Sequence, residues 1–145
     1  NRPVAMGPAT IQMQSVPTTV ARGPDGWLYV GQLTGFPFPV GGAKVYRVPP
    51  EGGTPVEYAG NFTNIIDIAF GPDGALYVLE FDANGLRTAG DTGALIRVAP
   101  NGARTTIAST GLTNPGGVAF GPDGAIYVTN MAVSPGGGQV LRVTP

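Results

Sequence analysis

The sequence predicts an all-β protein built as a β-propeller, with three blades of four antiparallel strands in this chain. The first observation is a turn motif, Gly-Pro-Asp-Gly, which begins at residues 23, 71 and 121, so that its copies are 48 and 50 residues apart. The second is the β-forming segment of aromatic and aliphatic residues that follows each copy. No stretch shows helical periodicity, and a repeat of this length is typical of a four-stranded blade.

The elements of the repeat follow in a fixed order around the turn. Proline sets φ at the second position of the turn, aspartate suits the third and glycine closes it. One strand comes before the turn, one after it, a third contains an arginine, and a fourth follows where the chain allows it. In the middle repeat, these strands are expected at 66–70, 75–78, 95–100 and 103–109.

The phase of the repeat leaves the ring open. Blade 1 is expected at about 16–62, blade 2 at about 63–112, and blade 3 at about 113–145, where a fourth strand is missing. An N-terminal strand at about 3–11 is positioned to complete a third blade. Since propellers close with about four to eight blades, three blades make half of a six-bladed ring. The partner is either a second copy that exchanges this strand or a separate N-terminal half of the same precursor.

Composition excludes several classes of function. The chain has no Cys and no His, which excludes disulfides, thiolate or histidine zinc sites and a Ser-His-Asp triad. A formal net charge of −1 gives no basic surface for nucleic acid. No apolar run approaches the roughly 20 residues of a membrane helix. The lack of Cys fits an extracytoplasmic protein, and a start at Asn1 without Met indicates a processed chain or an excised piece.

Several segments together resemble the ScyD/ScyE family of bacterial propeller proteins, with repeats like those of NHL and SMP-30 proteins. The most specific matches are "GQLTGFPFP" at 31–39 and "FTNIID" at 62–67, beside the turn and strand element that many six-bladed propellers share. The resemblance covers nearly the whole chain but only the C-terminal part of the family's usual length. It implies a six-bladed propeller in a secreted or periplasmic location, and it supplies no catalytic residues.

Aligning the repeats on the turn brings polar residues to shared positions near one predicted mouth of the channel. Six of them are candidates for binding a ligand or a metal ion: Gln32, Asn64, Asp67, Glu80, Asn114 and Asn130. Carboxylate and amide oxygens suit a hard cation such as Ca²⁺. Six-bladed lactonases of the SMP-30 and paraoxonase type use sites of this composition. The favoured interpretation is that these groups satisfy backbone donors and hold channel water, because the positions vary among the repeats.

Two further features carry side chains of interest. The loop at 34–42 contains Phe36 and Phe38 in a Pro-rich setting, and it either forms a recognition surface or packs across a blade. An arginine recurs in each third strand, where a structural pairing with a neighbouring acid or carbonyl is the favoured role. These arginines are Arg47, Arg97 and Arg142.

These observations predict a non-catalytic extracytoplasmic propeller module for assembly or for binding a ligand or protein, without a cofactor. The alternative is a Ca²⁺-dependent hydrolase of lactonase type with a metal site in the channel, formed by Glu80, Asp67 and Asn130. A third hypothesis is that the chain is the C-terminal part of a longer ScyD-like protein whose N-terminal half supplies the site.

Overall fold

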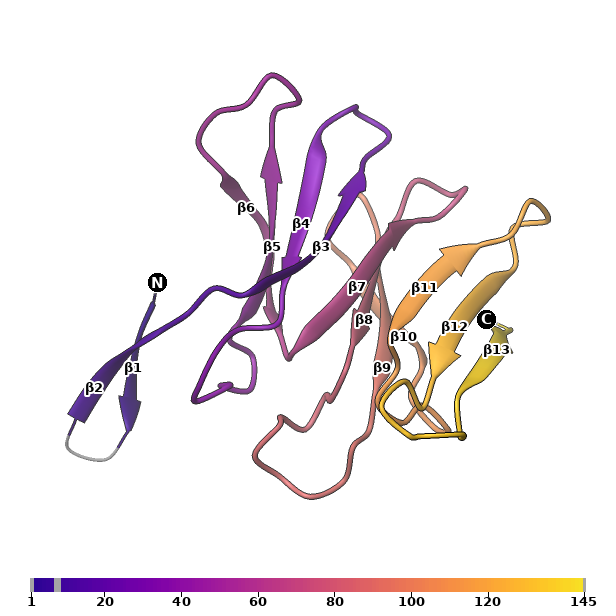
Figure 1. The fold of residues 1–145 in the computed structure, drawn as a ribbon. Coiled ribbons are helices and arrows are strands. Elements are labelled where there is room, and N and C mark those ends of the chain that lie inside the picture. The colour runs from indigo at the N-terminus through magenta and orange to yellow at the C-terminus, as the bar shows by residue number, and fades with distance from the viewer. Residues whose placement is uncertain (1, 7–8, 145) are drawn as a thin grey trace.

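A computed structural model describes residues 2–6 and 9–144, and strands are the only regular secondary structure in that part of the chain. Apart from an N-terminal hairpin, the strands form three antiparallel sheets that stand side by side as blades (Figure 1). None of the described residues forms a helix that could cross a membrane. The predicted all-β architecture is confirmed.

Each blade is a meander in which strands pair in chain order. Blade 1 consists of β3 (Pro17–Arg22), β4 (Leu28–Gln32), β5 (Ala43–Val48) and β6 (Val56–Phe62). Blade 2 consists of β7 (Ile65–Phe70), β8 (Leu76–Glu80), β9 (Ala94–Val98) and β10 (Arg104–Ala108). Blade 3 consists of β11 (Gly117–Phe120), β12 (Ile126–Asn130) and β13 (Gln139–Val143).

The N-terminal segment differs from the prediction. β1 (Arg2–Met6) and β2 (Ala9–Met13) pair with each other in a separate antiparallel sheet, which projects away from the blades (Figure 1). The prediction of one strand at about 3–11 is therefore wrong. The sequence Gly-Pro at 7–8, which lies outside the described residues, interrupts the β-forming run and explains why two strands form. The completion of blade 3 by this segment stays a prediction.

The Gly-Pro-Asp-Gly turns have the geometry that their residues predict. In the first turn, the N–H of Gly26 donates to the carbonyl oxygen of Gly23 at 2.9 Å, and Gly26 has a φ of +82°. A Cβ on Gly23 would lie 2.3 Å from the ring of Tyr29, so only glycine fits under that ring. The carboxylate of Asp25 accepts hydrogen bonds from the N–H of Trp27 at 3.1 Å and the hydroxyl of Tyr29 at 2.8 Å. The backbone bonds recur in the other two turns.

The hydrophobic core lies between blades, because each sheet buries both faces only where it has two neighbours. We call the face that contacts the preceding blade the leading face, and the face that contacts the following blade the trailing face. The trailing face of blade 1, with Tyr29, Val45 and Phe62, packs on the leading face of blade 2, with Leu76 and Val78. A second core joins blades 2 and 3 in the same way.

The first strands of the blades lie next to one another and bring the predicted channel residues together. β7 contacts both β3 and β11. The three Gly-Pro-Asp-Gly turns project at the upper end of Figure 1, while the loops after the second strands lie at the lower end. The start of each first strand and the end of each second strand therefore share the lower end.

Candidate functional site

The residue that ends the second strand of blades 2 and 3 fixes the segment that enters the same blade. In blade 2, Oε1 of Glu80 accepts a hydrogen bond from the N–H of Thr63 at 2.7 Å. In blade 3, Oδ1 of Asn130 accepts one from the N–H of Thr113, also at 2.7 Å. We call this hydrogen bond the entry latch. Both side chains are buried, so the latch satisfies backbone donors that solvent does not reach.

Gln32 occupies the corresponding position in blade 1, where the latch is absent. Both latched pairs are separated by 17 residues, which makes Ser15 the expected donor to Gln32. Gln32 is buried, but its Oε1 accepts no hydrogen bond within the described residues. A buried oxygen without a hydrogen bond is unfavourable. Blade 1 therefore differs from blades 2 and 3 in lacking the entry latch.

The asparagines before the first strands serve the backbone. Asn64 and Asn114 have φ values of +48° and +40°, in the left-handed region that asparagine tolerates best after glycine. The amide of Asn64 donates from Nδ2 to the carbonyl oxygen of Leu33 at 3.1 Å, which ties blade 2 to blade 1. Its Oδ1 has no hydrogen-bond partner among the described residues. Val16 has the same conformation in blade 1, with a φ of +40°.

Asp67 joins all three blades at their first strands. Its Oδ1 accepts a hydrogen bond from the hydroxyl of Thr19 in β3 at 2.6 Å and one from the N–H of Ile68 at 2.9 Å. Its Oδ2 accepts one from the N–H of Val118 in β11 at 2.9 Å. Because it accepts these three hydrogen bonds, the charged carboxylate of Asp67 links the first strands of the three blades.

The six channel candidates lie at one end of the blades, where Asp67 and Glu80 carry carboxylates and the other four carry amides. No group of three or more acidic, histidine or cysteine side chains converges in the part of the chain that the structure describes. The carboxylates of Asp67 and Glu80 and the amide oxygen of Asn130 already accept backbone hydrogen bonds. A calcium ion needs six to eight oxygen ligands, so these residues do not fit one in their present arrangement.

The carboxyl group of Glu80 has a raised pKa. Burial raises its pKa from 4.5 to about 7, and the Thr63 N–H and the charge of Arg104 oppose that rise only in part. A carboxyl group with such a pKa could exchange protons near neutral pH. Its side chain is enclosed rather than open to a substrate, since only 5% of Glu80 is exposed.

The loop at 34–42 combines the two roles that its sequence suggests. Phe36 is exposed, and its ring meets that of Phe38 edge to face with centroids 6.3 Å apart. The guanidinium of Arg87, from the loop of blade 2, lies 5.3 Å from the centroid of the Phe36 ring. Val40 lies against Gly85 of that same loop. The loop therefore packs on its neighbour and still presents one aromatic ring to solvent.

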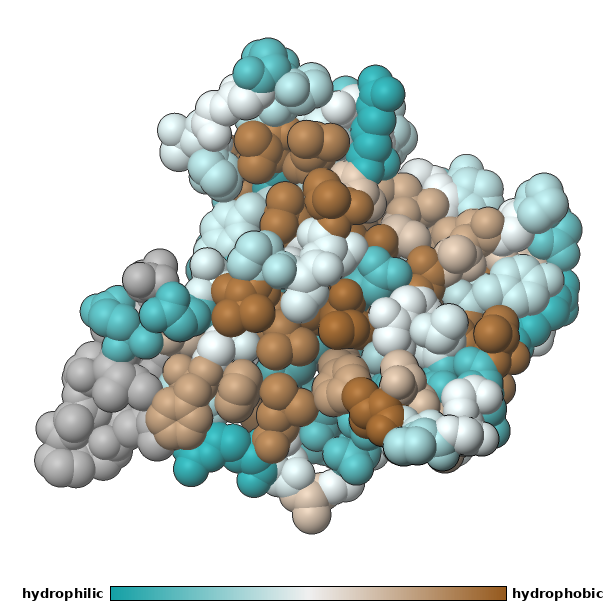
Figure 2. Space-filling view, in the orientation of Figure 1, coloured by the Kyte–Doolittle hydropathy of each residue, from teal (hydrophilic) through white to brown (hydrophobic). Residues whose placement is uncertain are grey.

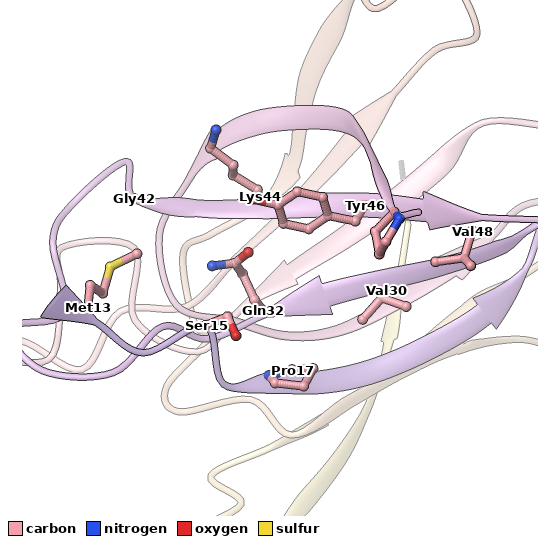
Figure 3. Close-up of a pocket in the computed structure, with 10 residues that line it drawn as sticks. Met13, Ser15, Pro17, Val30, Gln32, Gly42, Lys44, Tyr46 and Val48 are labelled. Atoms are coloured by element: carbon pink, nitrogen blue, oxygen red, sulfur yellow. The ribbon is translucent and has the colours of Figure 1, made fainter. Parts of the chain in front are cut away.

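A hollow on the leading face of blade 1 is the feature that sequence reasoning missed. It has a volume of ≈ 480 Å³ and a largely apolar lining. Gln32 lies inside it, between Ser15 on one side and Lys44 and Tyr46 on the other (Figure 3). Figure 2 shows apolar surface where Figure 1 draws β3 to β5. The repeat alignment could have indicated this face, because it marks the positions that are buried in blades 2 and 3.

Comparisons with known proteins identify the fold. No protein-family model matches the chain, and no curated protein matches it. A crystal structure provisionally named a gluconolactonase aligns with a TM-score of 0.58 and 19% identity, covering 89% of this chain and 44% of its own. A second, provisionally named an oxidoreductase (glucose dehydrogenase) from Thermus thermophilus, aligns with a TM-score of 0.53 and 23% identity, covering 88% of this chain and 44% of its own. The chain has the β-propeller fold.

The propeller neighbours also show how much of the ring this chain contains. The chain spans 44% of the length of each neighbour, in line with the half of a ring that three blades represent. Identities of 19% and 23% establish the shared fold alone. In this half-propeller, the leading face of blade 1 and the trailing face of blade 3 have no neighbouring blade within the described residues.

Proposed function

We propose that the chain is a non-catalytic half-propeller that works by assembly and by binding, outside the cytoplasm and within the ScyD/ScyE family. One observation carries this proposal: the polar side chains at the predicted channel mouth hold the blades together. Asp67 joins three first strands, and Glu80 and Asn130 latch the entries of their blades. At least one oxygen of each of these side chains accepts a hydrogen bond from the protein's own donors, and the sequence holds no His or Cys for acid–base or nucleophilic chemistry.

Binding is assigned to the lower end of the half-propeller, where Phe36 is exposed. The Arg87 guanidinium over its ring and the Phe38 ring at its edge hold the aromatic side chain in place. A fixed, exposed aromatic ring suits a ligand that offers a flat apolar surface. The extracytoplasmic location rests on the family resemblance, and cell fractionation tests it.

The second candidate is a Ca²⁺-dependent lactonase, with which the provisional name of the first structural neighbour, a gluconolactonase, is compatible. In that case Asp67, Glu80 and Asn130 would hold the ion, and the ion would polarise a lactone carbonyl. Their present hydrogen bonds do not fit this role, so any such site would depend on residues of a second half.

Calcium titration separates the two functions. We expect isothermal calorimetry to show no binding of Ca²⁺ at millimolar concentration, and we expect no hydrolysis of glucono-lactone above background. Calcium binding that is lost in Asp67→Asn but kept in the control Glu51→Gln, at an exposed position between β5 and β6, would overturn the non-catalytic proposal.

A further inference from the structure

The three blades carry matching side chains on their leading faces, but only two of these faces are covered. Val20, Ile68 and Val118 occupy the same position in the repeat. Ile68 and Val118 are 4% and 8% exposed, because each packs on the preceding blade, whereas Val20 is 63% exposed. An exposed apolar face with the composition of a buried one indicates a missing partner of the same kind.

The hollow on blade 1 has the side chains that a preceding blade contacts elsewhere in the molecule. Val30 and Val48 line it, and their counterparts Val78 and Val98 belong to the core between blades 1 and 2. These matching positions favour the interpretation that the hollow accommodates a neighbouring blade.

By its place in the chain, the N-terminal hairpin corresponds to the last two strands of a preceding blade. β1 and β2 pair antiparallel, as β5 with β6 and β9 with β10 do, and each of these pairs is followed along the chain by the first strand of the next blade, with eight residues between β10 and β11. Three residues separate β2 from β3, and two separate β6 from β7. By position in the repeat, β1 and β2 are the third and fourth strands of a blade whose first two strands are not in the described chain.

The entry latch supports the same conclusion. In blades 2 and 3, the segment that carries the donor N–H is fixed between a complete fourth strand and the first strand that follows. Ser15 follows β2, whose hairpin has no second strand beside it. The carbonyl oxygens of Gln14 and Val16 accept hydrogen bonds from the N–H groups of Gly35 and Leu33, but Oε1 of Gln32 stays unpaired within the described residues. A completed preceding blade would bring the N–H of Ser15 to Gln32.

We propose that the hollow on blade 1 receives two antiparallel strands of the same repeat, joined by a Gly-Pro-Asp-Gly turn, which pair with β1 to complete a four-stranded blade. The inference rests on the assembly role proposed above and names the partner. The partner's second strand pairs with the free edge of β1, as β4 pairs with β5 and β8 with β9. Its tyrosine and aliphatic side chains cover Val20 and Leu28, as Tyr77 and Leu79 lie in one core with their counterparts Val118 and Ile126.

A second copy of this chain does not fit the seat. Its last blade ends with β13 already paired to β12, on the edge that β1 would need. Adding the hairpin to that blade would duplicate the third strand and leave five strands. The observations therefore favour a two-stranded partner over a homodimer that exchanges its N-terminal segment.

An extended chain tests this proposal directly. A copy of residues 65–93, which contains β7, its turn, β8 and the following loop, is placed before Asn1 of the full chain. The matched control carries Leu79→Asp within the copy, because Leu79 belongs to the trailing face that contacts the next blade. We expect hydrogen exchange at the Ser15 amide to slow by about tenfold or more in the extended chain, and we expect the control to exchange as the original chain does.

Three results would overturn the proposal. The extended chain and its control could exchange at the same rate at Ser15. The original chain could have the native mass of two copies by light scattering, with Ser15 already slow and with Leu28→Asp reducing the mass to one copy. The extended chain could fail to fold while the control folds, as judged by urea unfolding. None of these results depends on calcium or lactone binding, so the partner and the non-catalytic function fail separately.

Discussion

Blades 1 and 2 share aliphatic residues at several positions of their leading faces, although Lys44 and Tyr46 of blade 1 replace Ala94 and Ile96, and the two faces have different surroundings. Leu28 and Leu76 follow the same turn at the same position, and Leu76 is fully buried whereas Leu28 is 37% exposed. The difference comes from the preceding blade, which blade 2 has and blade 1 lacks in the described chain. The comparison shows that the repeat encodes a surface for contact, while the neighbour decides whether that surface is core.

The largest effect expected from this comparison is a difference between two leucine truncations. Leu76→Ala should lower the free energy of unfolding by about 2–5 kcal/mol, because it leaves a cavity between two blades. Leu28→Ala should cost less than about 1 kcal/mol, because its side chain is partly in water already. Urea unfolding of both variants measures the difference. Equal losses would mean that a partner covers blade 1 in solution.

The next effect concerns the entry latches and pH. Because the folded pKa of Glu80 is about 7 and its ordinary value is 4.5, the folded state holds a proton that the unfolded state releases between these values. Stability from this group is complete below pH 4.5 and is lost as the pH rises through 7. Glu80→Gln, which matches Gln32 of blade 1, should remove this loss and stabilise the protein at pH 8 by up to about 3 kcal/mol.

Urea unfolding at several pH values between 4 and 8 checks the behaviour of Glu80. Glu51→Gln, at an exposed position, is the control and should keep the pH dependence of the original chain. A Glu80→Gln variant whose stability still falls between pH 5 and pH 8 as steeply as that of the original chain would assign the effect to another group.

A third prediction concerns the junction of the first strands. Asp67→Ala should cost about 1–3 kcal/mol, because it leaves the N–H of Val118 and the hydroxyl of Thr19 without their acceptor. Thr19→Val, which removes only the bond to blade 1, should cost about 0.5–1.5 kcal/mol. Hydrogen exchange at Val118 should accelerate in Asp67→Ala and stay unchanged in Thr19→Val. Acceleration in both variants would show that the junction acts as one unit.

The smallest effect is expected from the ion pairs between the third strand and the turn in blades 2 and 3. Nε of Arg97 lies 2.8 Å from Oδ2 of Asp73, while Nη2 of Arg142 lies 3.7 Å from Oδ2 of Asp123 and is more exposed. Arg97→Ala should lower Tm by less than about 2 °C, and Arg142→Ala should lower it less still. Calorimetry at low and at 1 M salt checks this, since salt screens exposed pairs. A difference that persists at high salt would point to packing instead.

Much of the fold could be predicted from local sequence. The turn glycines, the β-forming segments and the order of strands within a blade depend on neighbours in the chain, and the structure has them where the repeat places them. The pairing of the recurrent arginines with an acid was also predicted, and it is confirmed for Arg97 and Arg142. In blade 1, Arg47 lies over the Trp27 ring instead, at 4.9 Å from its centroid.

The candidate site was predicted less well, because the roles of its residues depend on contacts between blades. The repeat alignment placed Asp67, Glu80 and Asn130 at one end of the molecule, but it did not show which donors they meet. Asp67 meets donors that lie 48 and 51 residues away along the chain. Such distances are set by how whole sheets pack, and no local pattern records them.

The sequence alone determined the turns, the strands and the three-blade repeat of this protein, because short-range sterics and side-chain alternation decide these features. The tertiary structure alone decided which leading faces are buried, how the N-terminal hairpin pairs and why Glu80 has a raised pKa. The physical reason is that burial and desolvation depend on what lies across the interface between blades, and in blade 1 the described chain leaves that interface open.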